Sequence, residues 1–501
     1  MIVFIFPTKK QLKYLDTMNK VTYVFLKSNN AKDYKNIKVL NEEDINNCTA
    51  VACSEEAVYF LANLYKFGKR NISLQFTDEC FLLIRKQEAY ENFVAHGISC
   101  VNKSVEPVYN FPFVAKPNFG FGSIMVKQIA DDEDLVAYKN IFSEQMQNSA
   151  VEYYQEKYFK DIGNYIVYEE DCSDYDFYSV PFIFDKLSDT VEEFPILGLN
   201  KFKNLQYSDY YWSSFLYNPS QLSSRLKTKI HSLLIRLATS FCLASMVCMA
   251  ELLVNEVTGD VKLVEFSPRR PGGKLSQLIY MSTGVDLELV AIDLIFCGKS
   301  KIVINNNVPV VLKIDFKLGK NYDLTLQAPS EVFKCHLYYN FSYINSKAVA
   351  LIPGGFCPLH RGHQLLIDSA IQKCDMVIIM VIDRISADVP VHVRSEWIAD
   401  IYPQCIVLKV VNFPHDGADL DTLRNECFSK KLGNIKVNYV YHSNTDNMSL
   451  AERLEAINVL VDPERCCVPI SSTMIRANVS EYKKYVQPEI YEKYIKYKSN
   501  N

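Results

Sequence analysis

Short apolar runs alternate with amphipathic stretches over the first 110 residues. The apolar runs have the length of strands, and the stretches between them repeat apolar positions with the spacing of helices. We expect strands at residues 2–6, 21–27 and 49–54 and helices at residues 55–66 and 86–96. Because strands that alternate with helices form parallel sheets, residues 1–110 are expected to form an α/β domain.

The pattern changes to paired apolar runs after residue 110. Four such runs, at residues 111–117, 123–129, 165–171 and 177–185, predict a smaller antiparallel layer. Further along the chain we expect a long apolar helix at 222–246, a hairpin of two strands at 249–256 and 260–268, and a helix at 285–297. Residues 111–300 are therefore expected to form a second unit. A β-rich connector or small appendage is expected at residues 301–346.

Strand and helix patterns alternate again from residue 347 onward. Strands are expected at residues 347–355, 375–383, 405–413 and 436–443, and helices at residues 363–373, 394–401, 421–431 and 449–457. This alternation predicts a Rossmann-like, doubly wound parallel sheet over residues 347–501. The whole chain is accordingly expected to be an α/β protein.

The composition excludes several classes of protein. The 54 Lys and Arg residues against 58 Asp and Glu residues give a net charge of −4, so no global basic field is available to bind a nucleic acid. The N-terminal apolar run is too short for a signal peptide, and Arg236 and Glu251 interrupt the most apolar later stretch, so no membrane segment is expected. The 15 cysteines are odd in number and irregularly spaced, which is typical of reduced thiols. We expect a soluble cytoplasmic protein.

Glycine and histidine gather directly after the strand at residues 347–355. The sequence there is Gly354–Gly355–Phe356–Cys357–Pro358–Leu359–His360–Arg361–Gly362–His363, and a helix is expected to follow. The N–H groups at a helix start favour an anion, and glycine lets a phosphate approach the backbone closely. Two imidazoles can then donate to the oxygens of a transferring phosphoryl group. Since two of only eight histidines and three of 17 glycines meet here, we interpret the cluster as a phosphate site.

A second polar cluster, Ile470–Ser471–Ser472–Thr473–Met474–Ile475–Arg476, follows another strand-like run. Hydroxyl groups at a helix start either cap free N–H groups or bind a phosphate, and Arg476 lies one helical turn further on. Taken alone, this cluster leaves both interpretations open.

Together the two clusters resemble the nucleotidyltransferase superfamily with the signature G-x-F-x-P-x-H-x-G-H and a later I-S-x-T-x-x-R. Residues 347–495 look most like the nicotinamide mononucleotide adenylyltransferase domain of the NadR type. The resemblance implies ATP, Mg²⁺ and attack of an acceptor phosphate on the α-phosphorus, with release of pyrophosphate. It implies that His360 and His363 contact the ATP phosphates, that Ser472, Thr473 and Arg476 hold the β- and γ-phosphates, and that the backbone of Gly354, Gly355 and Phe356 lies close to the α-phosphate.

The second unit carries a lysine, a glycine loop and two carboxylates. Lys116 precedes Gly120 and Gly122, and a lysine beside a mobile glycine loop suits the binding of a triphosphate. Glu251 and Glu265 lie on the two strands of the expected hairpin. Carboxylates that face each other across strands repel unless a cation lies between them, and Mg²⁺ with ATP would fill that place. A glycine turn with an exposed lysine, and two solvated glutamates, are the simpler alternative.

This order of parts resembles the ATP-grasp superfamily over roughly residues 1–300, with residues 1–110 as the pre-ATP-grasp domain. The resemblance implies a nucleotide site that includes Lys86 and Lys116, an adenine- and ribose-binding hinge at Glu169 and Glu170, metal-binding carboxylates at Glu251 and Glu265, and a catalytic arginine at Arg269. Ser267 stands where the family usually has a metal-binding asparagine, which puts the second Mg²⁺ in doubt.

The two resemblances imply a bifunctional enzyme. An ATP-grasp carboxylate–amine ligase would precede an adenylyltransferase that joins a nucleoside monophosphate to a phosphate-bearing small molecule. The expected partners are a small carboxylate, an amine and the phosphate-bearing acceptor, without nucleic acid or membrane, and a homo-oligomer is compatible with the sequence. Two alternatives stay open: a CTP-dependent cytidylyltransferase of a phospho-alcohol or phosphonate, and a nucleotide-sensing regulator with a degenerate ATP-grasp domain.

Overall fold

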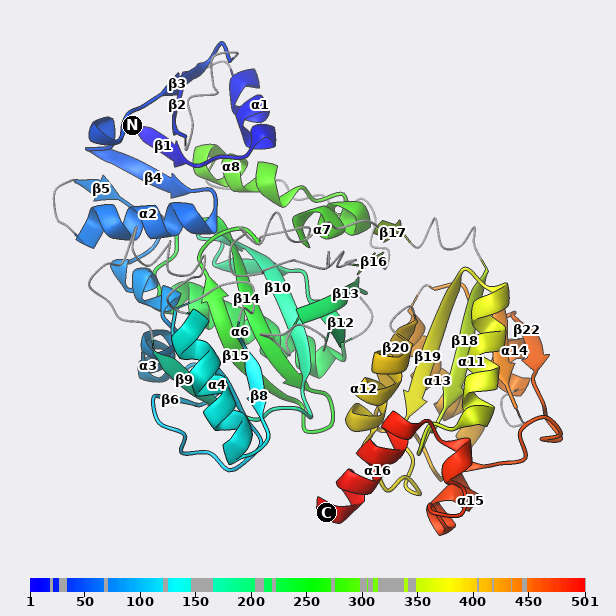
Figure 1. Ribbon diagram of the computed structural model, residues 1–501. Helices are drawn as coiled ribbons and strands as arrows, with labels where there is room; N and C mark the ends of the chain where they lie inside the picture. The colour runs from blue at the N-terminus through cyan, green and yellow to red at the C-terminus, as the bar shows by residue number, and fades with distance from the viewer. Residues whose placement is uncertain are drawn as a thin grey trace.

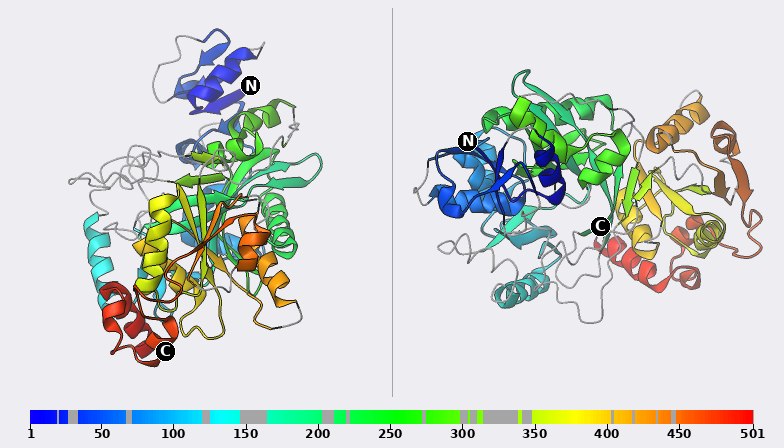
Figure 2. Two further views of the ribbon diagram at one scale, coloured as in Figure 1. Left: turned by 90° about the vertical axis from the view of Figure 1, so that its right-hand side faces the viewer. Right: turned by 90° about the horizontal axis from the view of Figure 1, so that it is seen from above.

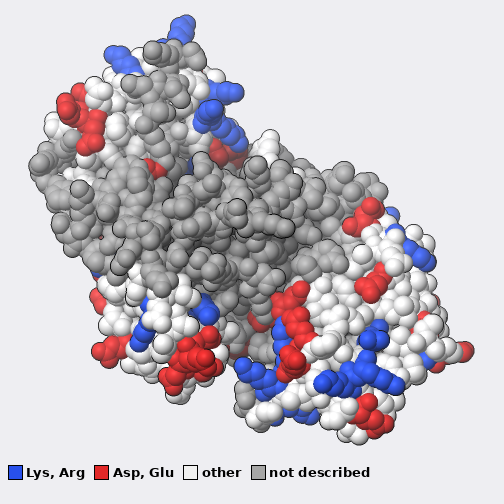
Figure 3. Space-filling model, in the orientation of Figure 1, with Lys and Arg blue, Asp and Glu red and all other residues white. Residues whose placement is uncertain are grey.

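The computed structural model contains four sheets arranged along an elongated molecule (Figure 1). It describes residues 1–18, 21–26, 34–66, 71–119, 125–145, 165–202, 211–218, 222–271, 275–297, 304, 310–313, 338–340, 348–402, 405–416, 419–433, 435–443 and 448–500. On the face shown in Figure 3, acidic and basic side chains are interspersed over the described surface, in keeping with the small net charge.

The N-terminal sheet is parallel, as predicted. Its strands are β1 (Ile2–Ile5), β2 (Thr22–Phe25), β3 (Ile37–Val39), β4 (Cys48–Ala52) and β5 (Ile72–Ser73), in the order β3-β2-β1-β4-β5. Helices α1 (Lys9–Thr17), α2 (Glu55–Lys66) and the distant α8 (Leu287–Cys297) cover it. Ile292 of α8 packs on Phe4 and Leu12, and Thr8 Oγ1 donates to Glu288 at 2.7 Å. The return of α8 ties the first domain to the second.

Two antiparallel sheets follow, where the sequence pattern predicts a single small layer. The smaller sheet has the order β6-β9-β7-β8, with β6 (Lys103–Ser104), β7 (Phe113–Pro117), β8 (Lys127–Ile129) and β9 (Ile166–Glu170). Helix α4 (Asp132–Gln145) packs on this sheet. Three further elements come earlier in the chain: the 3-10 segments η1 (Glu42–Asp44) and η2 (Asp78–Ile84), and helix α3 (Lys86–Ala95). The predicted run at 177–185 is wrongly grouped, because β10 (Asp176–Asp185) pairs with β14 (Met246–Asn255) of the larger sheet.

The larger sheet has the order β15-β14-β10-β12-β13-β16-β17, with β11 paired to β10. Its other members are β11 (Thr190–Glu193), β12 (Ile196–Phe202), β13 (Tyr211–Tyr217), β14 (Met246–Asn255), β15 (Asp260–Ser267), β16 (Val310–Lys313) and β17 (Tyr338–Asn340). Strands β16 and β17, which come from the stretch expected to be a β-rich connector or small appendage, extend this sheet next to β13.

The helix predicted at residues 222–246 is shorter than expected. Helix α6 (Ser224–Ser240) ends before Cys242, which adopts a positive φ of 45°, and β14 begins at Met246. A continuous apolar run does not distinguish a buried helix from a buried strand, which explains the error. Helix α7 (Leu275–Thr283) lies in a stretch where no helix is predicted.

The C-terminal sheet is parallel, with the order β20-β19-β18-β21-β22. Its strands are β18 (Val349–Gly354), β19 (Met376–Ile382), β20 (Ile406–Val410), β21 (Tyr439–His442) and β22 (Ile457–Leu460). The helices are α11 (Arg361–Lys373), α12 (Val391–Ile401), α13 (Leu420–Leu432), α14 (Met448–Arg453), α15 (Ser472–Ala477), the 3-10 segment η4 (Lys483–Tyr485) and α16 (Pro488–Asn500). Alternate residues of β18 and β19 enter two separate apolar clusters, so both faces are buried.

One predicted C-terminal helix is corrected. The helix expected at 449–457 is α14, which ends at Arg453. Glu455 then has a positive φ of 50°, and Ile457 already belongs to β22. The end of the chain returns as α16, whose Tyr494 packs among the core residues beside β18.

The C-terminal domain packs against the larger antiparallel sheet through β12, which lies against α12 and β20 (Figure 2). Leu197 and Leu199 of β12 share one apolar cluster with Leu408 of β20. Two ion pairs cross the same interface, Lys409–Asp176 at 2.5 Å and Lys431–Glu256 at 2.6 Å. Among the described helices, none is both long and apolar enough to cross a membrane.

Candidate active sites

The turn between β18 and α11 brings His360 and His363 into contact. Their rings stack, with centroids 3.7 Å apart and an interplanar angle of 20°. His360 is the N-cap of α11, and its Nδ1 accepts from the backbone N–H groups of Gly362 (3.2 Å) and His363 (3.4 Å). In return, the His363 Nδ1 accepts from the His360 N–H at 3.4 Å. The turn is therefore held by a capping box built from two imidazoles.

These hydrogen bonds decide which ring nitrogen carries the proton. Because Nδ1 accepts a backbone N–H in both rings, a neutral imidazole carries its proton on Nε2 and donates from there. Burial, reinforced by the charge of Arg465, lowers the pKa of His360 to about 3. Burial also holds the pKa of His363 well below its usual value, with smaller contributions from His360, Arg384 and Arg465. Both rings are consequently neutral donors at neutral pH.

Two glycines leave the space that these rings occupy. A Cβ atom at Gly362 would lie 3.1 Å from the His360 ring, and one at Gly354 would lie 2.8 Å from the Phe356 ring. Phe356 in turn contacts the His363 ring, with centroids 4.8 Å apart. A side chain at Gly354 or Gly362 would therefore crowd the aromatic rings that pack in the turn.

The second polar cluster packs directly on this turn. Nη1 of Arg476 donates to the carbonyl of Cys357 at 2.7 Å, and Nη2 donates to Thr473 Oγ1 at 3.3 Å. Ser472 Oγ donates to the carbonyl of Pro358 at 3.3 Å. The hydroxyl that caps α15 belongs to Ser471, which accepts from the Met474 N–H. Residues more than 100 positions apart in the chain thus meet at one turn.

Arg394 lies beneath the turn, although the sequence does not mark it as a site residue. Its side chain is fully buried; Nε donates to the carbonyl of Val389 at 2.7 Å, and Nη1 donates to the carbonyls of Gly355 and Ile382 (the latter at 3.1 Å). It therefore joins the carboxyl ends of β18 and β19. Arg394 lies four residues before the buried Ile398 and therefore on the same face of α12. This helical spacing is the one signal in the sequence that could have indicated a buried arginine.

On the N-terminal side, Glu169 forms a buried cluster with two lysines. Its carboxylate pairs with Lys103 and with Lys116, and all three residues are about 5% exposed. Burial opposes ionisation of Glu169, but the two ammonium groups lower its pKa to about 2. Burial, together with the neighbouring Lys103 and Lys86, lowers the pKa of Lys116 to about 8 against the opposing pull of Glu169. Sequence analysis misses Lys103, because β6 is only two residues long and gives no periodic signal.

Glu170, the second predicted hinge residue, faces the other side of β9. It accepts from Lys262 Nζ at 2.6 Å and from the backbone N–H and side-chain amide of Asn102 at 3.1 and 3.0 Å. Burial opposes its ionisation, but these hydrogen bonds lower the pKa of Glu170. Glu170 therefore connects β9 to β15, while Glu169 faces the lysines.

Four predicted residues line one pocket between α2, η2, the start of α3 and β15. Lys86 at the start of α3 meets Glu265, Ser267 and Arg269 there. Asn118 connects this helix start to the end of β7, since its backbone carbonyl accepts from the Lys86 N–H and its side chain accepts from the Gln87 N–H at 2.8 Å. We call this cavity the Lys86 pocket.

The two predicted metal-binding carboxylates are cross-strand neighbours. Glu251 of β14 is in register with Glu265 of β15, next to a shift of register. Ser267, two positions further along β15, lies on the same face as Glu265. In the described part of the chain, no group of three or more His, Cys, Asp or Glu side chains could hold a metal ion alone. Gly120 and Gly122 lie outside the described residues.

Comparison with known proteins identifies the fold around these residues. Residues 109–277 match the family model described as an ATP-grasp domain. The chain therefore contains an ATP-grasp domain. The matched range includes Lys116, Glu169, Glu251, Glu265 and Arg269.

Solved structures and a curated protein are also similar to parts of the chain. An L-amino acid ligase from Bacillus licheniformis has a TM-score of 0.44 and 12% identity over 64% of this chain and 81% of its own. The biotin carboxylase domain of the Hydrogenobacter thermophilus 2-oxoglutarate carboxylase has a TM-score of 0.47 and 13% identity over 62% of this chain and 74% of its own. The trifunctional NAD biosynthesis/regulator protein NadR of Salmonella typhimurium is 30% identical over 165 residues, which span 29% of this chain and 40% of that protein.

Proposed function

We propose that the protein is a bifunctional enzyme in which the ATP-grasp domain ligates a carboxylate to an amine and the C-terminal domain transfers an adenylyl group. The observation that supports the proposal is that each half brings several of the predicted phosphate-binding side chains together. One set is the Lys86 pocket with its neighbouring buried lysines. The other is the stacked histidine pair beneath Arg476.

In the proposed ligase reaction, ATP phosphorylates a substrate carboxylate, and an amine then displaces phosphate to form an amide. The two ammonium groups of Lys103 and Lys116 outnumber the single carboxylate of Glu169. The net positive charge favours binding of the polyphosphate chain of ATP. Arg269, which is nine-tenths buried and lines the Lys86 pocket, would stabilise the negative charge that develops during transfer.

The cross-strand carboxylates fit a magnesium ion that ATP shares. Mg²⁺ prefers oxygen ligands and is commonly bound through one or two carboxylates together with substrate phosphates. Glu251 and Glu265 supply two carboxylates in register, and Ser267 supplies a hydroxyl on the same face. Magnesium would neutralise phosphate charge there.

In the proposed transferase reaction, an acceptor phosphate attacks the α-phosphorus of ATP and pyrophosphate leaves. The Nε2–H groups of His360 and His363 would donate to phosphate oxygens, since their Nδ1 atoms are held by the backbone. Arg476 would add a positive charge at the same turn. The partial likeness to a protein named for NAD biosynthesis agrees with a nucleotide-forming reaction.

Product analysis tests both halves. The purified chain is incubated with ATP, Mg²⁺ and a panel of carboxylates, amines and phosphate-bearing acceptors. ADP with inorganic phosphate reports the ligase, and pyrophosphate reports the transferase. Failure to release either across a broad panel would overturn the proposal. Replacing ATP by CTP separates the adenylyltransferase from the alternative cytidylyltransferase.

We expect the transferase rate to show no change between about pH 5 and 8 that comes from ionisation of His360 or His363. The pKa of His360 is lowered to about 3 and that of His363 lies well below its usual value, so both rings stay neutral throughout this range. The measurement is kcat/KM against pH for pyrophosphate release. A fall in rate below a pKa near 6.5 would contradict the neutral-donor role.

A Ser267→Asn substitution tests the alternative of a nucleotide sensor. If the hydroxyl limits metal binding in an otherwise competent ligase, the amide oxygen of asparagine should raise ligase turnover at low Mg²⁺. ADP release is measured over a magnesium titration. A chain that binds ATP but shows no turnover in either form would favour the sensor.

A further inference from the structure

One carboxylate beside the histidine turn is used by neither proposed reaction. Asp388 lies in the segment between β19 and α12, and its side chain is 26% exposed. Its Oδ1 accepts from the thiol of Cys357 at 3.2 Å. Its Oδ2 accepts from the hydroxyl of Tyr494 and pairs with Lys498 Nζ at 3.0 Å. Asp388 therefore connects the turn after β18 with the C-terminal helix α16.

The Asp388 carboxylate is ionised at neutral pH, and the thiol that it binds is not. Burial opposes its ionisation, but hydrogen bonds from Tyr494, Lys498 and Cys357 lower the pKa of this carboxyl group. Burial and the hydrogen bond to Asp388 raise the pKa of the Cys357 thiol to about 11, so the thiol keeps its proton and donates it. Hydrogen bonds to an ionised acceptor are stronger than those between neutral groups. Asp388 therefore holds the Cys357 side chain in one orientation.

Cys357 connects this carboxylate to a predicted phosphate-binding residue. While its side chain donates to Asp388, its backbone carbonyl accepts from Arg476 Nη1 at 2.7 Å. Cys357 is 3% exposed and packs in one apolar cluster with Phe356 and Leu359, and close packing gives its backbone little freedom to move independently of its side chain. A displaced Cys357 side chain would therefore move the carbonyl that orients the Arg476 guanidinium.

Helix α16 fixes the other side of the carboxylate. Tyr494 is 1% exposed and belongs to the same apolar cluster as Cys357, so its hydroxyl is held in place. Lys498 lies four residues further along α16 and therefore on the same face of the helix. Its side chain is 43% exposed, so it adds positive charge from the solvent side. The carboxylate thus has partners on both sides, in the turn and in the helix.

We propose that Asp388 is a positioning residue of the transferase site, which acts through Cys357 to hold the Arg476 guanidinium against the phosphates of the nucleotide. This role rests on the proposed transferase reaction. Functional side chains are held in productive geometry by supporting residues whose own positions are fixed by packing and hydrogen bonds. Tyr494 and Lys498 fix the carboxylate, so the C-terminal helix α16 takes part in the reaction without contacting the substrate.

Two substitutions of Cys357 separate positioning from simple packing. A serine hydroxyl can donate to Asp388 as the thiol does, whereas alanine has no donor. We expect Cys357→Ala to lower kcat for pyrophosphate release about tenfold and Cys357→Ser to keep it within about threefold of the parent. If the side chain only fills apolar space, the order is reversed, because a buried hydroxyl without a partner is costlier there than a methyl group. That reversed order would overturn the proposal.

A double-mutant cycle tests the path through Arg476. Asp388→Asn should lower the same kcat about tenfold, because one amide oxygen cannot accept on both sides of the side chain. In an Arg476→Met background, which lacks the guanidinium, Asp388→Asn should change kcat by less than about twofold. Equal losses in the two backgrounds, or no loss in the parent, would show that Asp388 does not act through Arg476.

Further variants keep the test decisive. Tyr494→Phe removes only the hydroxyl and replaces Asp388→Asn in the cycle if that variant does not fold; a full parent rate in Tyr494→Phe would also contradict the proposal. Glu426→Gln, an exposed carboxylate on α13, is the matched control and should leave kcat unchanged.

Failure of the transferase reaction itself is recognised separately, because the parent chain then releases no pyrophosphate with any acceptor. In that case the affinity for inorganic pyrophosphate, measured by isothermal calorimetry, decides the role of Asp388. Asp388→Asn should weaken this binding about as much as Arg476→Met does. Equal binding by the parent and Asp388→Asn, or no binding by the parent, would overturn the proposal.

Discussion

Replacing His363 by alanine is expected to lower the rate of pyrophosphate release about 10²–10³-fold, because it removes one preorganised donor to the transferring phosphoryl group. The ring also accepts the His360 N–H through Nδ1, so alanine disturbs the capping box as well. His363→Asn separates the two effects. An asparagine Oδ1 can accept the same N–H but has no group at the position of Nε2.

We therefore expect His363→Asn to keep the thermal stability of the parent chain and to lose nearly as much rate as His363→Ala. His415→Ala, in the same domain but outside the motif, is the matched control and should leave the rate unchanged. A full rate in the folded His363→Asn variant would remove the imidazole donors from the mechanism. The ligase rate, measured in the same samples, should not change.

Replacing Glu169 by alanine is expected to destabilise the ATP-grasp domain by about 3–5 kcal/mol, because it leaves two buried ammonium groups without their shared carboxylate. Urea denaturation in the absence of nucleotide measures the change. Glu133→Ala, which removes an exposed carboxylate from α4, should change stability by no more than about 0.5 kcal/mol. A Glu169→Ala variant as stable as the parent would show that the cluster contributes little.

The same cluster predicts a dependence of stability on pH. The pKa of Glu169 is about 2 in the folded protein and 4.5 in its ordinary state. Since the folded pKa is the lower one, the stabilisation is complete above about pH 4.5 and is lost as the pH falls toward 2. The Glu169→Ala variant should therefore not lose this part of its stability as the pH falls.

Local chemistry explains what the sequence predicts well. The start of α11 at residues 360–363 is held by hydrogen bonds within the motif itself, so the spacing of its two histidines indicates its geometry directly. The hairpin turn likewise fixes the pairing of Val254 with Val261, but a shift of register between Leu252 and Glu251 is what brings Glu251 opposite Glu265.

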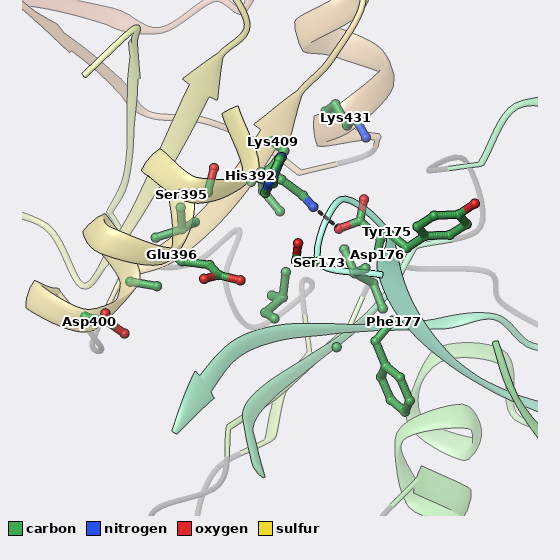
Figure 4. Close-up of a pocket in the computed structure, with 16 residues that line it drawn as sticks. Ser173, Tyr175, Asp176, Phe177, His392, Ser395, Glu396, Asp400, Lys409 and Lys431 are labelled. Atoms are coloured by element: carbon green, nitrogen blue, oxygen red, sulfur yellow. Dashed lines mark ion pairs between the residues drawn. The ribbon is translucent and has the colours of Figure 1, made fainter. Parts of the chain in front are cut away.

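Long-range pairing explains what the sequence misses. β10 resembles its neighbours in composition, and its pairing with β12 and with β14, about 70 residues away, places it in the larger sheet. Lys103 gains its significance from Glu169, which lies on another strand. Asp176 and Lys409 form an ion pair although more than 200 residues separate them, and no local pattern links them (Figure 4).

The packing of β12 against α12 and β20 has a consequence for traffic between the halves. A shared apolar cluster and two ion pairs hold the two domains together at this interface. Such an interface does not suit a domain that moves back and forth to carry a bound intermediate between two active sites. If one half supplies the other, we expect the intermediate to be released from the first site before it binds at the second. A scavenging enzyme added to the medium could then intercept it.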